Sequence, residues 1–232
     1  MKFTPALVRA RFLRRYKRFL VDVELGGERV TVHCPNTGSM TNCLVEGSDC
    51  WLMPSDNPKR KYRFGLELVT TTTGHIAGVN TLRANGLVEE ALRDGVISEL
   101  ASFEEMRREV KINEKSRIDF QLTQGDQQCF LEVKSVTLSF DGLQGLFPDT
   151  KSVRALKHVK ELISLTQSGH KAALLFCVQH SGVRRVAPAV DIYPEYALAL
   201  KAAQKAGVSI VAYAADISEQ EIRLTKPLPV IL

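Results

Sequence analysis

Residues 116–120 read Ser-Arg-Ile-Asp-Phe, and residues 129–134 read Cys-Phe-Leu-Glu-Val-Lys. In both stretches apolar and polar residues alternate, which is typical of a β-strand with one buried face. Ile118 and Phe120 would share the buried face. Gly125-Asp126 suits a two-residue hairpin turn between the strands. With that turn, Asp119 lies directly opposite Glu132, and both carboxylates project from the same face.

Asp119, Glu132 and Lys134 together have the side chains needed for phosphodiester hydrolysis. Opposed carboxylates repel each other, and a hard divalent cation such as Mg²⁺ or Mn²⁺ would turn that repulsion into binding. Such a cation lowers the pKa of a bound water, and a neighbouring ammonium stabilises charge on a phosphate. We therefore interpret Asp119, Glu132 and Lys134 as candidate catalytic residues, with the two acids as metal ligands.

The same register also permits a lattice of ion pairs without any metal. Arg117 would oppose Lys134, so Asp119 could pair with Lys134, and Arg117 with Glu132. Surface lattices of this kind are common and contribute little to stability. The spacing alone slightly favours the lattice over a metal site.

Positive charge is concentrated at the start of the sequence. The net charge is +5, and residues 1–80 hold 12 Lys and Arg against 7 Asp and Glu. A concentrated basic patch indicates a polyanionic partner, here DNA. A solvated strand face with a basic tail is the alternative. The candidate DNA-binding residues in this half are Arg14, Arg15, Lys17, Arg18, Lys59, Arg60 and Lys61.

Residues 1–80 are predicted to form a small β-barrel of five strands. The expected strands are Leu7–Leu13, Phe19–Leu25, Arg29–Cys34, Asp49–Met53 and Arg63–Thr73. Interleaved aromatic and basic residues suit an OB-type barrel that binds nucleic acid, although Phe12 and Phe19 are better explained as core. The loop Asn36–Ser39 is either a phosphate-binding loop or an ordinary turn.

Residues 81–232 are predicted to form an α/β domain with a mixed sheet, because helical and strand patterns alternate. The expected helices are Leu87–Leu100, a short one opened by the capping box Ser102–Glu105, Val153–Ser168 and Pro194–Ala206. The expected strands are Glu109–Ile112, Arg117–Leu122, Cys129–Val136, Ala172–Val178 and Val208–Ala214.

Several classes of protein are disfavoured by composition. Five cysteines with no CxxC pair argue against a zinc site and a disulfide framework. No apolar run is long enough to span a bilayer, and Met1–Leu20 lacks the apolar core of a signal peptide. We therefore expect a soluble cytoplasmic protein.

Asp119 followed by Glu132-Val133-Lys134 resembles the D…(D/E)-x-K signature of the restriction-endonuclease-like superfamily, with Ile118 in place of the usual proline. Almost the whole chain resembles the bacterial sugar fermentation stimulation protein family. The matching segments are residues 15–20, 33–40, 116–120, 132–138 and 147–149. The resemblance implies an OB-like domain, a nuclease-like domain, sequence-independent DNA binding and a regulatory role in sugar, notably maltose, metabolism.

The resemblance also draws attention to residues on two helices. Arg154, Lys157 and His158 share a face with Glu161, and that face either contacts phosphate or is merely solvated. The family's Arg-Gly-x-Lys-His has Ala155 in place of glycine here. Glu89 and Glu90 lie where many superfamily members place an additional metal-ligating glutamate, although a lone helical glutamate is usually just solvated.

Three functions compete on this basis. The first is a DNA-binding protein with a metal-dependent nuclease site. The second is a DNA-binding regulatory protein whose nuclease-like domain is inactive. The third, a sugar-metabolising enzyme, lacks a phosphate-binding glycine loop or a glycosidase-like acid pair.

Overall fold

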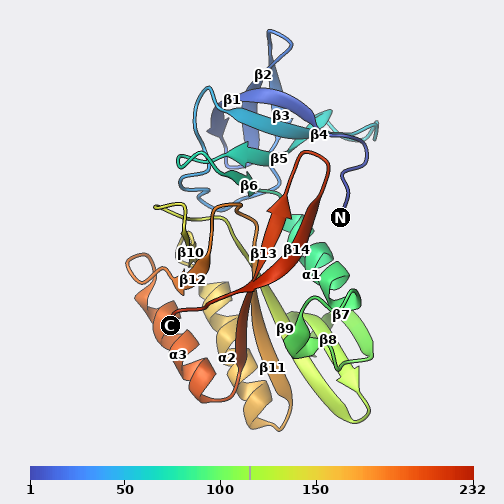
Figure 1. Ribbon diagram of the computed structural model, residues 1–232, viewed down its shortest axis with the longest axis vertical. Coiled ribbons are helices and arrows are strands. Elements are labelled where there is room, and N and C mark those ends of the chain that lie inside the picture. The colour runs from blue at the N-terminus through green and yellow to red at the C-terminus, as the bar shows by residue number, and fades with distance from the viewer. Residues whose placement is uncertain (115) are drawn as a thin grey trace.

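The computed structural model describes residues 1–114 and 116–232, which form a β-barrel followed by an α/β domain (Figure 1). The barrel strands are β1 (Val8–Tyr16), β2 (Leu20–Leu25), β3 (Glu28–His33), β4 (Asp49–Pro54), β5 (Phe64–Thr70) and β6 (Ile76–Gly78). Their order is β3-β2-β1-β4-β5-β6, and a further pairing of β3 with β5 closes the barrel. The predicted OB-like barrel is confirmed. The last expected strand is shorter, because the chain turns at Gly74 (φ 75°) and returns as β6.

The barrel interior contains one of the two aromatic residues predicted to lie there. Phe12 is buried at 3% exposure, whereas Phe19 is 46% exposed. The prediction for Phe19 is wrong because this residue lies in the connection between β1 and β2, directly after the left-handed residues Lys17 and Arg18, where its side chain is exposed.

The α/β domain is built on a mixed sheet, as predicted, and β14, which the sequence did not indicate, makes it six-stranded. Its elements are η1 (Thr81–Arg83), α1 (Ala84–Arg93), η2 (Ser98–Leu100), β7 (Glu105–Asn113), β8 (Ser116–Gln124), β9 (Gln127–Val136), β10 (Gln144–Phe147), α2 (Val153–Gln167), β11 (Lys171–Val178), β12 (Arg185–Pro188), α3 (Pro194–Lys205), β13 (Ser209–Ile217) and β14 (Ile222–Leu228). The sheet order is β14-β13-β11-β9-β8-β7, and β9, β11 and β13 run parallel.

Helices cover both faces of this sheet (Figure 1). One apolar cluster joins α1 to the sheet through Leu87 and Leu131, and the other joins α2 and α3 through Val159 and Leu200. Ser152 caps the start of α2 by accepting a hydrogen bond from the Ala155 amide. Among the described residues, no helix combines the length and apolar character needed to cross a membrane.

Two predicted helices differ from the structure. The capping box at Ser102 and Glu105 opens no helix, because Glu105 begins β7 and pairs with Thr123 of β8. Tertiary strand pairing here overrides a local capping signal. The helix expected to reach Leu100 ends at Arg93, just before Gly95, whose φ of 68° is left-handed.

The barrel and the α/β domain share one core and are also joined by strand-like contacts, one of them the β-bridge between Ala77 of β6 and His180. Trp51 and Leu68 of the barrel belong to the apolar cluster beneath α1. Near the start of the chain, Lys2 forms a β-bridge with Glu221, and the Phe3 amide donates to the Gln220 carbonyl at 2.8 Å. The first residues are therefore bound to the β13–β14 hairpin.

Candidate metal-dependent active site

The hairpin of β8 and β9 has the predicted register from its turn as far as Phe120, and the register is not continued at Asp119. Phe120 pairs with Leu131, and the ladder continues to Gln124 and Gln127 around the expected turn. The described ladder stops at Phe120, so Asp119 and Glu132 are not a backbone pair. Instead, Asp119 Oδ2 accepts a hydrogen bond from the Val133 amide at 2.8 Å. Asp119 thus contacts the neighbouring strand through its side chain.

A change of face at Asp119 explains why the ladder opens. Phe120 packs in the cluster beneath α1, whereas Ile118 packs in the cluster beneath α2. The prediction that both share one face is therefore wrong. The neighbouring strand β7 carries a left-handed residue, Glu109 (φ 52°), between the pairs Arg108–Phe120 and Val110–Ile118. This irregularity lies opposite Asp119 and accompanies the twist that reverses the two faces.

Glu132 is buried at 3% exposure, and one of its two oxygens is paired with the ammonium of Lys134. Oε1 accepts from Lys134 Nζ at 2.5 Å and also contacts His158 Nδ1 of α2. Burial alone would raise the pKa of Glu132, but His158 and Lys134 outweigh it and hold the pKa below its ordinary value. Oε2 is buried and has no hydrogen-bond partner among the described residues.

Asp119 has different partners from those that the ion-pair lattice would require. Its Oδ1 accepts from Asn85 Nδ2 of α1 at 2.8 Å, and its Oδ2 is held by the Val133 amide. Burial, and then repulsion from Glu132, raise the pKa of Asp119. Lys134 pairs with Glu132 rather than Asp119, so the predicted lattice is not formed.

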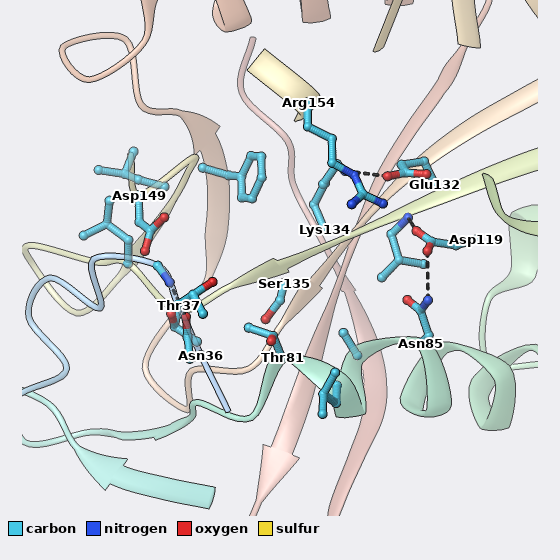
Figure 2. A pocket seen from close by; sticks show the side chains of 18 of the residues that line it. Asn36, Thr37, Thr81, Asn85, Asp119, Glu132, Lys134, Ser135, Asp149 and Arg154 are labelled. Atoms are coloured by element: carbon cyan, nitrogen blue, oxygen red, sulfur yellow. Dashed lines mark hydrogen bonds and ion pairs between the residues drawn. The ribbon is translucent and has the colours of Figure 1, made fainter. Parts of the chain in front are cut away.

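These side chains line a cleft of about 530 Å³ between the barrel and the α/β domain. Figure 2 shows Asn85, Asp119, Glu132, Lys134 and Arg154 gathered on one side. The opposite wall carries Asn36 and Thr37, which belong to the barrel loop, together with Asp149. The loop Asn36–Ser39 therefore faces the same space as the two carboxylates.

Arg15 holds this barrel loop in place. Its guanidinium donates to the carbonyls of Asn36 at 2.8 Å, Gly38 at 2.9 Å and Ser39 at 3.2 Å. From the other domain, Asp149 Oδ2 accepts from the Ser39 hydroxyl and the Met40 amide, each at 3.2 Å. These contacts fix the barrel wall of the cleft, so Arg15 has a structural task that the sequence did not indicate.

The remaining candidate DNA-binding residues occupy different environments. Arg14 pairs with the buried Asp22 at 3.0 Å. Lys17 and Arg18 form an exposed turn with φ values of 49° and 63°. The loop cations are also exposed: Lys59, Arg60 and Lys61.

The three candidate DNA-binding residues on α2 lie in different environments. Arg154 is exposed and lines the cleft. Lys157 is 3.6 Å from Glu161, which agrees with the solvated-pair alternative. His158 is buried at 5% exposure and contacts Glu132, a role that neither alternative for this helix face described.

The weak metal candidates on α1 lie outside the cleft lining. Glu89 is 2.8 Å from both Arg93 and Arg108, and Glu90 is 2.7 Å from the amino group of Met1. Asn85, one helical turn before Glu89, is the α1 residue that reaches Asp119. Sequence reasoning missed Asn85 and the link between His158 and Glu132, although the four-residue spacing places Asn85 and Glu89 on one helix face.

The residues present fit a cation that keeps most of its water. No group of three or more His, Cys, Asp or Glu suited to metal binding occurs in residues 1–114 and 116–232. Mg²⁺, however, is commonly held by one or two carboxylates with several waters. The carboxylates of Glu132 and Asp119 lie close enough to repel each other, and Oε2 of Glu132 has no hydrogen-bond partner among the described residues, so the pair meets that requirement.

Comparisons with known proteins cover the whole chain. Residues 13–79 match the model described as the SfsA N-terminal OB domain, and residues 82–221 match the sugar fermentation stimulation protein RE domain. Sugar fermentation stimulation protein homologs from Teredinibacter turnerae and Saccharophagus degradans are 55% and 53% identical, each over 100% of both chains. The solved structure of Pyrococcus furiosus SfsA in complex with Ca²⁺ is 28% identical with a TM-score of 0.88. That match covers 100% of this chain and 98% of the other.

Proposed function

Because the chain belongs to the sugar fermentation stimulation protein family, with an OB domain and an RE domain, we propose that it is a metal-dependent nuclease that binds DNA without sequence preference. The observation that carries the proposal is the buried Glu132, whose Oε2 has no partner among the described residues and whose charge repels that of Asp119. A buried carboxylate oxygen without a donor is costly unless a cation binds it.

Each residue of the cleft has a distinct role in this proposal. Asp119 and Glu132 bind Mg²⁺ or Mn²⁺, which when bound supplies charge neutralisation at the phosphate and a more acidic water. Asn85 and the Val133 amide orient Asp119, and His158 orients Glu132. Lys134 places an ammonium at 2.5 Å from Glu132, where it can stabilise negative charge that develops on a phosphate.

The Pyrococcus furiosus relative supports a cation in this fold, since its structure is described as a complex with Ca²⁺. Ca²⁺, Mg²⁺ and Mn²⁺ all prefer oxygen ligands. The exposed cations at Lys17, Arg18 and residues 59–61 would contribute sequence-independent attraction to the DNA backbone.

A second candidate function is a DNA-binding regulatory protein with an inactive cleft. It is favoured by the contacts of Glu132 Oε1, which already has Lys134 and His158 as partners. A carboxylate so engaged needs no metal to balance its charge. In either case, a regulatory contribution to sugar metabolism, as the family's name suggests, would act through DNA.

The deciding experiment is cleavage of single- and double-stranded DNA in Mg²⁺, Mn²⁺ or EDTA by the wild type, Asp119→Asn, Glu132→Gln and Lys134→Ala. We expect wild-type cleavage only with metal, and a loss of at least about 100-fold in each variant, in line with the removal of one electrostatic catalytic group. Binding in EDTA should persist in all four proteins. Binding without wild-type cleavage would favour the inactive regulatory protein, and cleavage by Glu132→Gln at the wild-type rate would overturn the mechanism.

A further inference from the structure

A second hollow of about 690 Å³ adjoins the cleft and shares Glu109 and Arg154 with it. Four of the residues that line it carry fixed positive charge: Lys111, Arg117, Arg154 and Lys157. The acids in its lining are Glu109 and Glu114, and the buried His158 separates it from Glu132. Cations therefore outnumber acids there, whereas residues 81–232 as a whole hold 19 of each sign.

Two of these cations are placed against each other. Lys111 of β7 and Arg117 of β8 are direct Cα partners in the antiparallel ladder, and both are exposed. Like charges directly opposite each other on a sheet destabilise it. No ion pair of either residue occurs within residues 1–114 and 116–232. In the described part of the chain, the two cations thus face each other beside the cleft without an ion-pair partner.

Such a repulsion becomes favourable when an anion lies between the cations. A phosphodiester backbone carries one negative charge per nucleotide, and Arg and Lys are its usual protein contacts. Arg154 lies at the junction, where it can contact the phosphate next to the one bound at Asp119 and Glu132 (Figure 2).

We propose that Lys111, Arg117 and Arg154 form a phosphate-binding track along which the nucleic acid strand leaves the cleft over the β7–β8 hairpin. The inference rests on the proposed function, because it assigns the polyanion in this track to the same strand that enters the cleft. It places substrate binding on the α/β domain, beyond the cations of the barrel.

A charge-swap series tests the track independently of cleavage. Lys111→Glu and Arg117→Glu each replace a repulsive pair with an attractive one, so both variants should melt at or slightly above the wild-type temperature. The double variant restores like charges with the opposite sign and should melt close to the wild type. Proteins that fold as well as the wild type and bind less tightly exclude loss of fold as the cause.

Binding is measured in EDTA by the anisotropy of labelled single strands of about 16 and about 4 nucleotides, the range of strand lengths that single OB domains hold. For the longer strand each single variant should bind several-fold more weakly, with the double variant weakest. The slope of log Kobs against log salt should fall by about 0.7 for each phosphate of the single strand that a variant no longer neutralises. The affinity for the short strand, which the cleft alone can hold, should fall much less.

The matched control is Lys201→Glu with Lys205→Glu on α3, which makes the same charge change at exposed residues outside both hollows. Its affinity for the longer strand should stay near the wild-type value. An equal loss of affinity in the control and in the Lys111 and Arg117 variants would overturn the track, as would an unchanged salt slope in the latter. If the wild type itself bound neither strand, the proposed function would fail instead.

Discussion

The barrel holds the whole excess of positive charge, whereas the α/β domain, with equal numbers of cations and acids, holds the second hollow and the acidic wall of the cleft. In the barrel much of that charge has a structural role. Arg14 and Arg29 bind the buried Asp22, Arg9 binds Asp49, and Arg15 binds loop carbonyls. In the α/β domain, Lys111 and Arg117 face each other beside an open hollow. Local compensation of charge is therefore a better guide to a ligand than the net charge of a region.

The largest expected effect concerns Asp22 and tests whether the barrel's cations have a structural role. Burial alone would raise its pKa, but hydrogen bonds from Arg29, Thr31 and Arg14 hold the pKa far below its ordinary value. We expect Asp22→Asn to lower the free energy of unfolding by about 2–3 kcal/mol, because the variant no longer offers these donors a buried charged acceptor.

The contribution of Asp22 also has a defined pH dependence. Its folded pKa is depressed, so its stabilisation is fully present above the unfolded pKa of about 3.9 and is lost as the pH falls through the folded value. Urea melts of the wild type and Asp22→Asn should therefore converge in strong acid. A constant difference down to the lowest accessible pH would contradict the assignment.

Metal binding is the second test and concerns the α/β domain. If Asp119 and Glu132 hold Mn²⁺, the ion should stabilise the wild type by about 1.4 kcal/mol at ten times its Kd, by mass action. Asp119→Asn should abolish that shift. Thermal melts with EDTA and with Mn²⁺ measure both proteins.

The same melts also measure the stability of Asp119→Asn without metal, for which the pKa of Asp119 gives a prediction. Burial and Glu132 raise the pKa of Asp119, so in the metal-free protein this group favours folding at low pH and the advantage is lost as the pH rises through the folded pKa. At neutral pH we therefore expect the variant to be as stable as the wild type or more so. A destabilised variant, together with a wild type insensitive to metal, would count against the metal site.

The third test separates the barrel's structural cations from its exposed ones. Arg15→Ala should cost about 1 kcal/mol of stability, because the loop carbonyls no longer have a donor. Lys17→Glu with Arg18→Glu should change stability by less than about 0.5 kcal/mol, as expected for exposed residues, and weaken DNA binding at low salt. Denaturant melts and salt titrations distinguish them. If Arg15→Ala and the double variant lost the same DNA affinity and the same stability, the distinction between structural and exposed cations would be wrong.

Glu89 offers the smallest expected effect. It pairs with Arg93 and Arg108 on the surface, so Glu89→Gln should lower stability by about 0.5 kcal/mol. The Mn²⁺-induced shift should be the same as in the wild type, because Glu89 does not line the cleft. If Glu89→Gln showed no Mn²⁺-induced shift, the result would support Glu89 as a metal ligand.

The fold was predictable where local patterns carry the information. The turn at Gly125 and Asp126 set the register of β8 and β9, and helices α2 and α3 followed from their caps and periodicity. The helix expected at Ser102 was not recoverable in this way, because its outcome depends on pairing with a strand that comes later in the chain.

The candidate site was predictable in composition and less so in geometry. Period-2 alternation placed Asp119 and Glu132 near each other but assumed an unbroken ladder, which the left-handed Glu109 on the neighbouring strand does not allow. Nothing in the residues around His158 or Asn85 indicates that each contacts one of the two acids, since those contacts come from helices packed on the sheet. The structural role of Arg15 was also missed, because its partners are backbone carbonyls, and these cannot be identified from the types of the side chains.

The β-bridge between Lys2 and Glu221 has a consequence for how the protein is made. A ribosome produces the barrel long before the β13–β14 hairpin to which its leading residues attach, and early domains generally fold as they emerge. Trp51 and Leu68, the barrel's share of the common core, gain partners as soon as α1 follows, because Leu87 belongs to the same cluster. The pairing of Lys2 and Phe3 with Glu221 and Gln220 can therefore form only after the residues between them have been synthesised.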